Sequence, residues 1–152
     1  PIDQALQLAA QVHVAIGSAA AREREAAPVQ GRLATVVHPQ ASVSGAGTLA
    51  AGCFVAAQAV VAPGARVGWC GIVNHGAVVD HDVQVGDYTH VAPLSALGGG
   101  AKLGDRALLG SGSVVLPGRR VGNDCVVGAG AVVRSDLAEA GTYAGVPAQR
   151  VR

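Results

Sequence analysis

The sequence predicts an all-β solenoid with a small N-terminal α/β fragment in front of it. Valine or leucine occupies every sixth position from Val37 to Val133, without insertion or deletion. The fourth residue after each of these aliphatic residues is usually small, as at Cys53 and Ala77. Helices repeat about every 3.6 residues and strands every two, so neither produces this pattern. A fixed short period is typical of a solenoid, in which each repeat buries its apolar side against its neighbours.

Each six-residue unit supplies one short strand and one corner. Three units close a triangular coil, so the repeat predicts nearly six coils. Strands stacked ~4.8 Å apart would give a prism roughly 25–30 Å long. A residue suited to turns often follows the aliphatic residue, and we expect the corner's positive φ there. These residues are Gly68, Asn74, Asp80, Gly86, Gly98, Gly104, Gly110, Gly122 and Gly128.

The chain divides into three parts. Residues 1–35 carry no repeat, and we expect a helix over residues 2–9, a strand over Val12–Ile16 and a helix from the N-cap Ser18 through Glu25. These elements would form a fragment of an α/β layer. The solenoid is expected over residues 36–136, and residues 137–152 would cap its C-terminal end.

Composition and charge exclude several classes of protein. A net charge of +1 gives no electrostatic argument for binding nucleic acid or an anionic membrane. The uncharged stretch over residues 39–65 is interrupted by prolines and glycines and keeps the six-residue register, so we reject a membrane span. The three cysteines lack metal or redox spacing. With no signal peptide predicted, they indicate a reducing compartment, and we expect a cytoplasmic protein.

The polar residues that interrupt this repeat of valine, glycine and alanine are concentrated in one coil. Three of the five histidines, His75, His81 and His90, lie within sixteen residues. Because Val79 points inward in the expected register, His81 should project outward between the carboxylates of Asp80 and Asp82. A carboxylate can hold one ring nitrogen of a histidine and leave the other free as a base. The alternative interpretation is a surface histidine among solvating aspartates.

The same coil carries a family resemblance. Residues 73–82 are similar to the "NTGAVVDHD" segment of sugar acetyltransferases, which include bacterial sialic acid O-acetyltransferases and the UDP-4-amino-sugar N-acetyltransferases of bacillosamine synthesis. The similarity continues through residues 90–93, 95–100, 110–112, 117–118, 127–133 and 144–148. It covers about residues 35–152 and implies a left-handed parallel β-helix of hexapeptide repeats. It also implies acetyl-CoA as co-substrate, no metal, and a homotrimer with active sites between subunits.

The resemblance also implies roles for individual residues. His81 is similar to the general base, and Asp82 to the acidic residue that orients it. His90 would contact the acetyl or thioester end of acetyl-CoA. The acceptor would lie near Asn74, His75 and Asp80. The pantetheine arm would approach the corner at Gly98 and Gly99, where a main-chain N–H could hold the oxyanion. The arm and adenine would run one and two coils further along the same line, past Ser111, Gly112, Ala129 and Gly130, which are otherwise ordinary corner residues.

A zinc site fits the histidines poorly. Zinc enzymes of the γ-carbonic anhydrase type, which share this fold, use three histidines, two of them separated by five residues. Here His75 and His81 are six apart, His90 lies nine further on, and His38 is wrongly spaced upstream. We therefore expect no metal.

The sequence departs from the family in two places. Full-length members begin with a Rossmann-like sugar-nucleotide domain, and only its last portion, around residues 14–18, is recognisable here. Either the sequence is truncated or the acceptor is not a sugar nucleotide bound in the usual way. His75 also replaces the family's usual Thr or Ser. The predicted function is acetyl transfer to the amine or hydroxyl of a sugar, free or nucleotide-linked. The rival hypotheses are a non-catalytic, bactofilin-like solenoid scaffold and a degenerate acetyltransferase.

Overall fold

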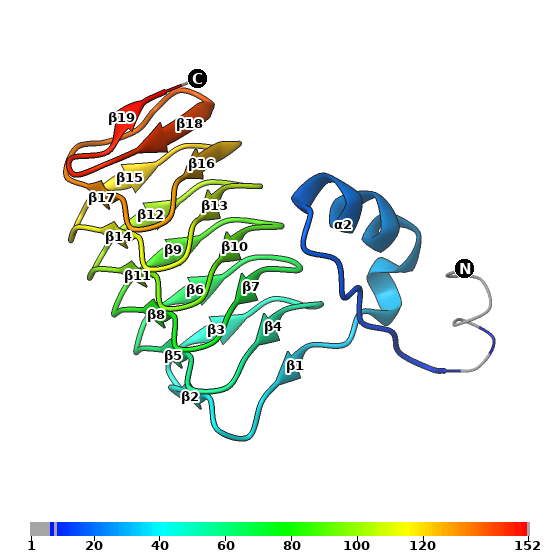
Figure 1. Cartoon of the computed structure of the whole chain (residues 1–152). Coiled ribbons are helices and arrows are strands. Elements are labelled where there is room, and N and C mark those ends of the chain that lie inside the picture. The colour runs from blue at the N-terminus through cyan, green and yellow to red at the C-terminus, as the bar shows by residue number, and fades with distance from the viewer. Residues whose placement is uncertain (1–6, 8, 152) are drawn as a thin grey trace.

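The computed structural model describes residue 7 and residues 9–151 and shows a solenoid of stacked coils with a helical segment beside it (Figure 1). Strands three places apart in the chain pair in parallel, as β4, β7 and β10 do, so each coil contributes one strand to each of three sheets. The predicted solenoid is confirmed, and no long insertion separates its coils.

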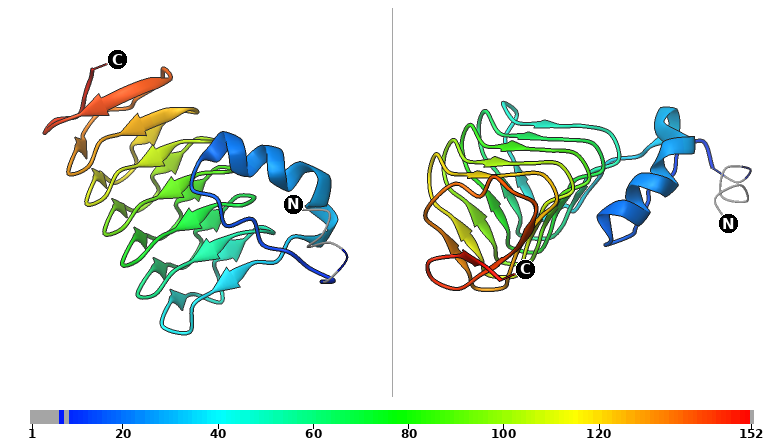
Figure 2. Two further views of the ribbon diagram at one scale, coloured as in Figure 1. Left: turned by 45° about the vertical axis from the view of Figure 1, so that its right-hand side comes forward. Right: turned by 90° about the horizontal axis from the view of Figure 1, so that it is seen from above.

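We number the sheets in the order in which the chain visits them. Sheet 1 contains β1 (Val36–Val37), β4 (Phe54–Val55), β7 (Ile72–Val73), β10 (His90–Val91), β13 (Leu108–Leu109), β16 (Cys125–Val127), β18 (Gly141–Ala144) and β19 (Gln149–Arg150). Sheet 2 contains β2 (Ser42–Val43), β5 (Val60–Val61), β8 (Val78–Val79), β11 (Ala96–Leu97), β14 (Val114–Val115) and β17 (Val132–Val133). Sheet 3 contains β3 (Thr48–Leu49), β6 (Arg66–Val67), β9 (Gln84–Val85), β12 (Lys102–Leu103) and β15 (Arg120–Val121). Seen from above, the coils stack along one axis (Figure 2).

The repeat aliphatic residues form the core. From Val55 to Val133 each of them is at most 5% exposed, because it is the last residue of its strand and points inward. Small residues at the fourth position, such as Cys53 and Ala77, are fully buried and fill the remaining space. Val37 has 42% of its surface exposed, because it lies in the first coil and no earlier coil among the described residues stacks on it.

The predicted positions of positive φ are wrong by two residues. The left-handed residues lie three places after the aliphatic residue, as at Gly64 (φ +74°) and Asp82 (φ +59°). The residue directly after the aliphatic is often glycine for a different reason. A Cβ on Gly104 would lie 2.4 Å from Oδ1 of Asn123 in the next coil, so these glycines allow the coils to stack closely.

The N-terminal segment confirms one predicted helix. Ser18 caps α2 (Ala19–Ala26), and the 3₁₀-helix η1 (Ala27–Arg32) follows. The expected strand over residues 12–16 is reduced to a single bridge between Val12 and Leu33. The helix expected over residues 2–9 lies largely outside the described residues. No helix in the described part of the chain is long and apolar enough to cross a membrane.

A buried arginine fastens this segment to the solenoid. Arg22 on α2 is 1% exposed, and its guanidinium donates hydrogen bonds to five backbone carbonyls. Two belong to the N-terminal segment itself, at Ile16 (2.7 Å) and Gly17 (2.9 Å). The other three belong to the corner between sheets 3 and 1, at Cys70 (2.8 Å), Tyr88 (2.5 Å) and Thr89 (2.9 Å). An apolar cluster at the same corner includes Val14, Ala26, Val29, Leu33, Cys70 and Tyr88.

The C-terminal end of the solenoid is covered by its own chain. Strand β18 adds to β16 in parallel and β19 turns back against β18. Tyr143 is 7% exposed, and Ala148 packs against the same core cluster. The last stacked coil is therefore not left open to solvent.

Candidate active site

His81 lies at the corner between sheets 2 and 3, two residues after the end of β8. Its side chain is 63% exposed, as the repeat register predicts, and its Nδ1 lies 3.0 Å from Oδ2 of Asp82. Asp80 shapes the turn, because its Oδ1 accepts a hydrogen bond from the His81 N–H at 2.7 Å. The hydrogen bond to Asp82 raises the pKa of His81, and the charge of Asp80 raises it further. Nδ1 is thus held by a carboxylate while Nε2 is available to a reactant.

The free nitrogen of His81 faces Gly99 in the next coil. A Cβ built on Gly99 would lie 2.4 Å from Nε2 and 2.6 Å from Cε1 of His81. Gly98, beside it, has another function: a Cβ there would lie 2.8 Å from Pro117 in the following coil. Gly98 therefore permits stacking, whereas Gly99 leaves room for the imidazole.

A second polar group is centred on Asn74. Its Oδ1 accepts from the His75 N–H at 2.8 Å and lies 2.8 Å from Nδ1 of the His75 ring. Its Nδ2 donates to Nε2 of His90 at 3.0 Å, which places the His90 proton on Nδ1. Burial lowers the pKa of His90, and the positive charge of Arg22 lowers it further. His90 is therefore held in the neutral form that this hydrogen bond requires.

Asn74 and His90 lie at one end of a cavity of about 280 Å³ between sheet 1 and the N-terminal segment. The walls of the cavity are residues 13–17 on one side and Val36, Phe54 and Ile72 on the other. The His13 ring lies 5.9 Å from the Phe54 ring, and its Nδ1 is 3.1 Å from the carbonyl oxygen of Ala34. An apolar cavity with a few convergent polar groups is the usual form of a small-molecule site.

Within one chain, these two groups lie on opposite sides of the prism. His90 projects from sheet 1, and the corner that carries His81 joins sheets 2 and 3. In a three-sided coil that corner lies opposite sheet 1. The structure therefore brings Asn74, His75 and His90 together, and separately Asp80, His81, Asp82 and Gly99.

The expected line of donor-binding residues does not exist within a chain. Gly98 and Gly99 follow β11 at the corner between sheets 2 and 3, whereas Ser111 and Gly112 follow β13 at the corner between sheets 1 and 2. Ala129 and Gly130 follow β16 at that same second corner. The expected offsets of one and two coils from Gly99 are wrong, because Ser111 lies twelve and Ala129 thirty residues after it. Successive corners are six residues apart, and only an offset of eighteen returns the chain to the same corner.

Three features of the site escaped sequence reasoning: the anchor Arg22, the cavity wall at residues 13–17, and the contacts of Phe54 and Ile72. Arg22 is one of four consecutive charged residues in α2, and nothing in the sequence distinguishes it from the other three. The described residues include no group of three His, Cys, Asp or Glu side chains placed to hold a metal ion.

Comparisons with known proteins identify the family to which this fold belongs. Residues 100–135 match the family "Bacterial transferase hexapeptide (six repeats)". A variant of perosamine N-acetyltransferase from Caulobacter crescentus, solved with CoA and GDP-perosamine, is 38% identical with a TM-score of 0.93. That match covers 96% of this chain and 71% of the other. The acetyltransferase domain of PglB from Neisseria gonorrhoeae, also solved with acetyl coenzyme A, is 30% identical with a TM-score of 0.90, covering 93% and 70% of the two chains.

Curated relatives include serine acetyltransferase from Helicobacter pylori, which is 34% identical over 99 residues. That match covers 59% of this chain and 58% of the relative, so the chain spans little more than half the length of this protein. The structural matches confirm the left-handed β-helix and the sugar N-acetyltransferase resemblance. The chain belongs to the hexapeptide-repeat acyltransferases.

Proposed function

We propose that this chain is an acetyl-CoA-dependent acetyltransferase that acts on the amine or hydroxyl of a sugar, free or nucleotide-linked, with His81 as general base. The observation that carries the proposal is the pairing of His81 with Asp82 through Nδ1, while Nε2 faces the space that Gly99 leaves open. A histidine oriented in this way removes a proton from a nucleophile as it attacks. The solved neighbours bind CoA together with a sugar nucleotide, or acetyl coenzyme A, which supports both substrates.

The proposed reaction needs one acid–base group. Nε2 of His81 takes the proton from the acceptor as its nitrogen or oxygen attacks the thioester carbonyl. The carbon–sulfur bond then breaks, and the thiolate of CoA recovers the proton from His81. Asp82 holds the ring in position and stabilises its cationic form, as the acid of a catalytic triad does.

The corner glycines supply the complementary group for the developing negative charge. The N–H of Gly98 is already donated to the Val115 carbonyl at 2.9 Å. Within the described part of the chain no acceptor is present for the N–H of Gly99. We assign that N–H to the oxyanion, since a donor without a partner can be used in the transition state.

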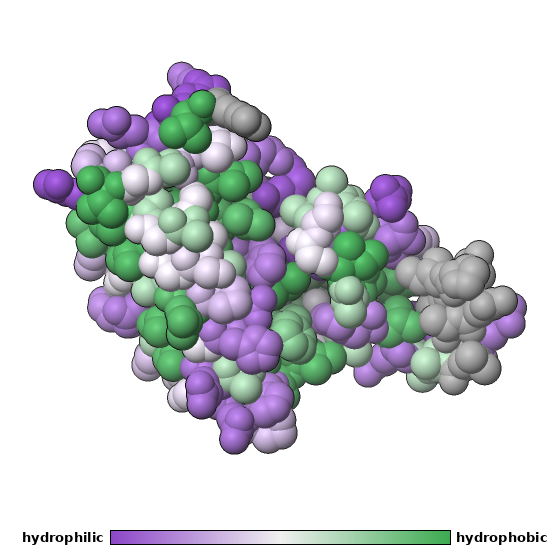
Figure 3. Space-filling view, viewed as in Figure 1, coloured by the Kyte–Doolittle hydropathy of each residue, from purple (hydrophilic) through white to green (hydrophobic). Residues whose placement is uncertain are grey.

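A homotrimer would complete the site, and the three faces of the prism differ in a way that supports one. The outward residues of sheet 2 are Ser42, Val60, Val78, Ala96, Val114 and Val132. Sheet 1 is partly covered by the N-terminal segment, and sheet 3 carries charged residues. Apolar and pale residues cover the side of the solenoid where sheet 2 lies (Figure 3). A flat apolar face of this kind is buried most simply against copies of itself.

The shared site follows from this arrangement. If three prisms place sheet 2 toward a common axis, the His81 corner of one chain approaches the opposite edge of sheet 2 in the next chain. That edge carries Asn74, His75, Ser111 and Gly112, followed by Ala129 and Gly130. We propose that His90 and these residues complete, from the neighbouring subunit, the site that His81 and Gly99 begin.

The acceptor pocket has a definite place in the structure. We assign it to the cavity of about 280 Å³ that Asn74 and His90 share with residues 13–17. Residues 1–35 would then be the remnant of a Rossmann-like sugar-nucleotide domain, residues 36–136 the acetyltransferase domain and residues 137–152 the cap. All three cysteines are buried and unpaired, which supports a cytoplasmic location.

A thiol-release assay tests the proposal. Acetyl-CoA would be offered with a panel of nucleotide amino sugars, and we expect free CoA thiol with at least one of them. His81→Ala should abolish this turnover while the Kd for acetyl-CoA, measured by calorimetry, changes by no more than a few fold. Turnover by His81→Ala equal to that of the parent enzyme would show that the base is another residue. Open filaments in light scattering and no thiol release with any acceptor would support a scaffold instead.

A further inference from the structure

Leu94 combines two features that cost stability in the single chain. Its φ is +61°, in the left-handed region that a residue with a bulky side chain rarely adopts. It also has 73% of its surface exposed, more than any other large apolar residue in the described part of the chain. Packing within one chain explains neither feature, which indicates that this side chain has a role outside the fold of the single chain.

Leu94 lies at the corner between sheets 1 and 2, after strand β10 and before strand β11. The other left-handed residues at this corner, one in each coil, are Gln58, Gly76, Gly112 and Gly130. A Cβ on Gly112 or on Gly130 would meet nothing within 4 Å, so the described chain leaves the corner open at these two coils. A Cβ on Gly76 would lie 2.8 Å from Cδ2 of Leu94. The leucine side chain therefore leans over Gly76 and closes the corner at that coil.

The level of Leu94 along the solenoid matches that of the proposed catalytic groups. Leu94 comes thirteen residues after His81 and five before Gly99, and one coil contains eighteen residues. Because the chain advances along the solenoid axis with each coil, Leu94 lies between the levels of His81 and Gly99. Within one chain, sheet 2 separates the two corners. In the proposed trimer, the His81 corner of one chain approaches the Leu94 corner of the next chain at the same level.

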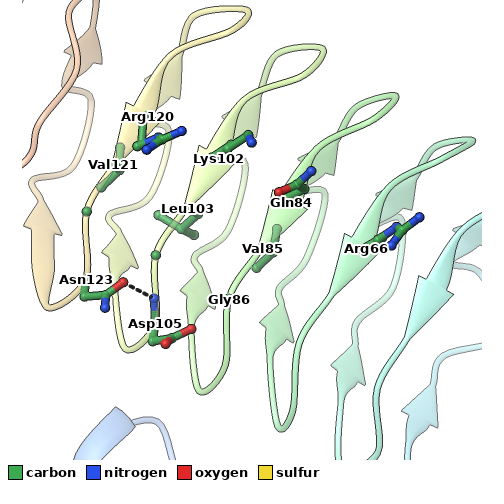
Figure 4. Close-up of a pocket in the computed structure, with 12 residues that line it drawn as sticks. Arg66, Gln84, Val85, Gly86, Lys102, Leu103, Asp105, Arg120, Val121 and Asn123 are labelled. Atoms are coloured by element: carbon green, nitrogen blue, oxygen red, sulfur yellow. Dashed lines mark hydrogen bonds between the residues drawn. The ribbon is translucent and has the colours of Figure 1, made fainter.

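The character of the three faces supports this pairing of corners. The outward residues of sheet 3 include Arg66, Lys102 and Arg120, and Figure 4 shows these side chains leaving the same face of the sheet. Packing such a face against a copy of itself would bring like charges together, which is unfavourable. Sheet 1 is partly covered by the N-terminal segment. The apolar sheet 2 is therefore the face that copies can share, and its two edges are the corner of His81 and the corner of Leu94.

A thioester at this shared site would end against Leu94. With its carbonyl beside Nε2 of His81, the pantetheine arm would pass the open corner at Gly112 and Gly130 of the neighbouring chain. The acyl chain leaves the carbonyl carbon on the side away from the sulfur, so it would point toward Gly76. Leu94 covers that glycine. An acetyl group would end in front of the leucine, whereas each further methylene would enter the space that the leucine side chain fills.

We propose that Leu94 limits the size of the transferred acyl group, because its side chain closes the active site of the neighbouring subunit behind the methyl group of acetyl-CoA. This inference rests on the proposed function, since it takes an acyl-CoA donor with His81 as base. The reaction is the same for every acyl group. The acceptor nitrogen or oxygen bonds to the acyl carbon, the carbon–sulfur bond breaks, and the acceptor's proton passes through His81 to the sulfur of CoA. A pocket wall discriminates against one extra methylene by about 10-fold to 200-fold.

The test offers acetyl-CoA and butyryl-CoA to the parent enzyme, Leu94→Ala and Leu94→Gly in the thiol-release assay. We expect the parent kcat/KM for butyryl-CoA to be at least about 100-fold below that for acetyl-CoA. In Leu94→Gly this ratio should rise in favour of butyryl-CoA by at least about tenfold, with Leu94→Ala between the two. Leu94→Gly should fold, because glycine adopts a positive φ without strain. Gln58→Gly is the matched control, since Gln58 has the same φ of +61° at the same corner, two coils earlier, and it should leave the ratio unchanged.

The outcomes separate this inference from the proposed function. An equal ratio in the parent and in Leu94→Gly would refute the size limit and leave the function standing. The same shift in Gln58→Gly would also refute it, because relief of backbone strain would then be the cause. Monomers of Leu94→Gly in light scattering would show that the leucine serves only the subunit interface. If the parent protein released no thiol with any acceptor, the function would be refuted. In that case a Kd for butyryl-CoA, measured by calorimetry, at least tenfold lower in Leu94→Gly than in the parent would support the closed pocket, and equal values would refute both.

Discussion

Gly99→Ala tests whether the space beside His81 is part of the catalytic apparatus. The added Cβ would lie 2.4 Å from Nε2, and ordinary contact begins at 3.4 Å, so the ring nitrogen must retreat by about 1 Å. That movement also strains the 3.0 Å contact between Nδ1 and Asp82. A displacement of this size at a reacting group can cost about 100-fold in rate. We therefore expect kcat to fall by about 100-fold in the thiol-release assay.

The fold should tolerate the change, because the side chain that must move is 63% exposed and lies outside the core. We expect the Tm of Gly99→Ala to stay within about 3 °C of that of the parent protein. Gly45→Ala is the matched control, since nothing lies within 4 Å of a Cβ at that position. Unchanged kcat in Gly99→Ala would refute the idea that Nε2 works at this corner. A collapse of Tm would indicate that the glycine serves stacking, as Gly98 does.

Three further predictions concern the acid–base pair, the anchor and the interface. Asp82→Asn replaces the charged hydrogen-bond partner of His81 Nδ1 by a neutral amide, which weakens the interaction that raises the pKa of His81. The acidic limb of the kcat profile should therefore move to lower pH and kcat should fall at least about tenfold; an unmoved limb would contradict the pairing. Arg22→Ala leaves five carbonyls without their donor, a loss of about 3–5 kcal/mol. In hydrogen exchange, residues 12–33 should lose protection while residues 55–133 keep theirs, and equal protection in both would show that Arg22 is not the anchor. Val114→Lys, in the middle of sheet 2, should convert a trimer into monomers in light scattering, whereas Thr48→Lys on sheet 3 should not; an intact trimer would move the interface to another face.

The sequence predicts the solenoid well because one exact period specifies which residue of every unit points inward. Each of the aliphatic residues from Val55 to Val133 is buried where the register places it, and His81 projects as predicted. The backbone conformation of the corners is harder to predict from the sequence. Glycine directly after the aliphatic residue suggests a left-handed turn. At Gly104, however, glycine is needed because a side chain would collide with the next coil. The left-handed conformation falls two residues later, on residues such as Asp82 and Tyr88. Stacking between coils depends on residues eighteen apart, which a six-residue pattern does not distinguish.

In the candidate site, too, the sequence predicts contacts between neighbouring residues but not contacts between distant segments. Asp80, His81 and Asp82 are neighbours in sequence, and local reasoning finds their contact. Arg22 reaches Cys70 and Tyr88 only because a separate segment packs on the corner between sheets 3 and 1. Lys102 and Arg120 are eighteen residues apart and stand opposite each other only because their strands pair in the folded solenoid. These features arise from packing between distant segments, so local patterns carry little sign of them.

Subunit complementation tests the central claim, an active site shared between chains, most directly. The single variant His81→Ala would be co-expressed with a double variant that carries both Asn74→Ala and His90→Ala. Each of these two variants should be inactive when expressed alone. In an equal, random mixture about one site in four combines an intact His81 from one chain with an intact pocket from its neighbour. A shared site therefore predicts that about a quarter of the parent activity returns in the thiol-release assay. If His81 and the pocket acted within one chain, no mixture would contain an intact site, and activity would stay at the level of the separate variants.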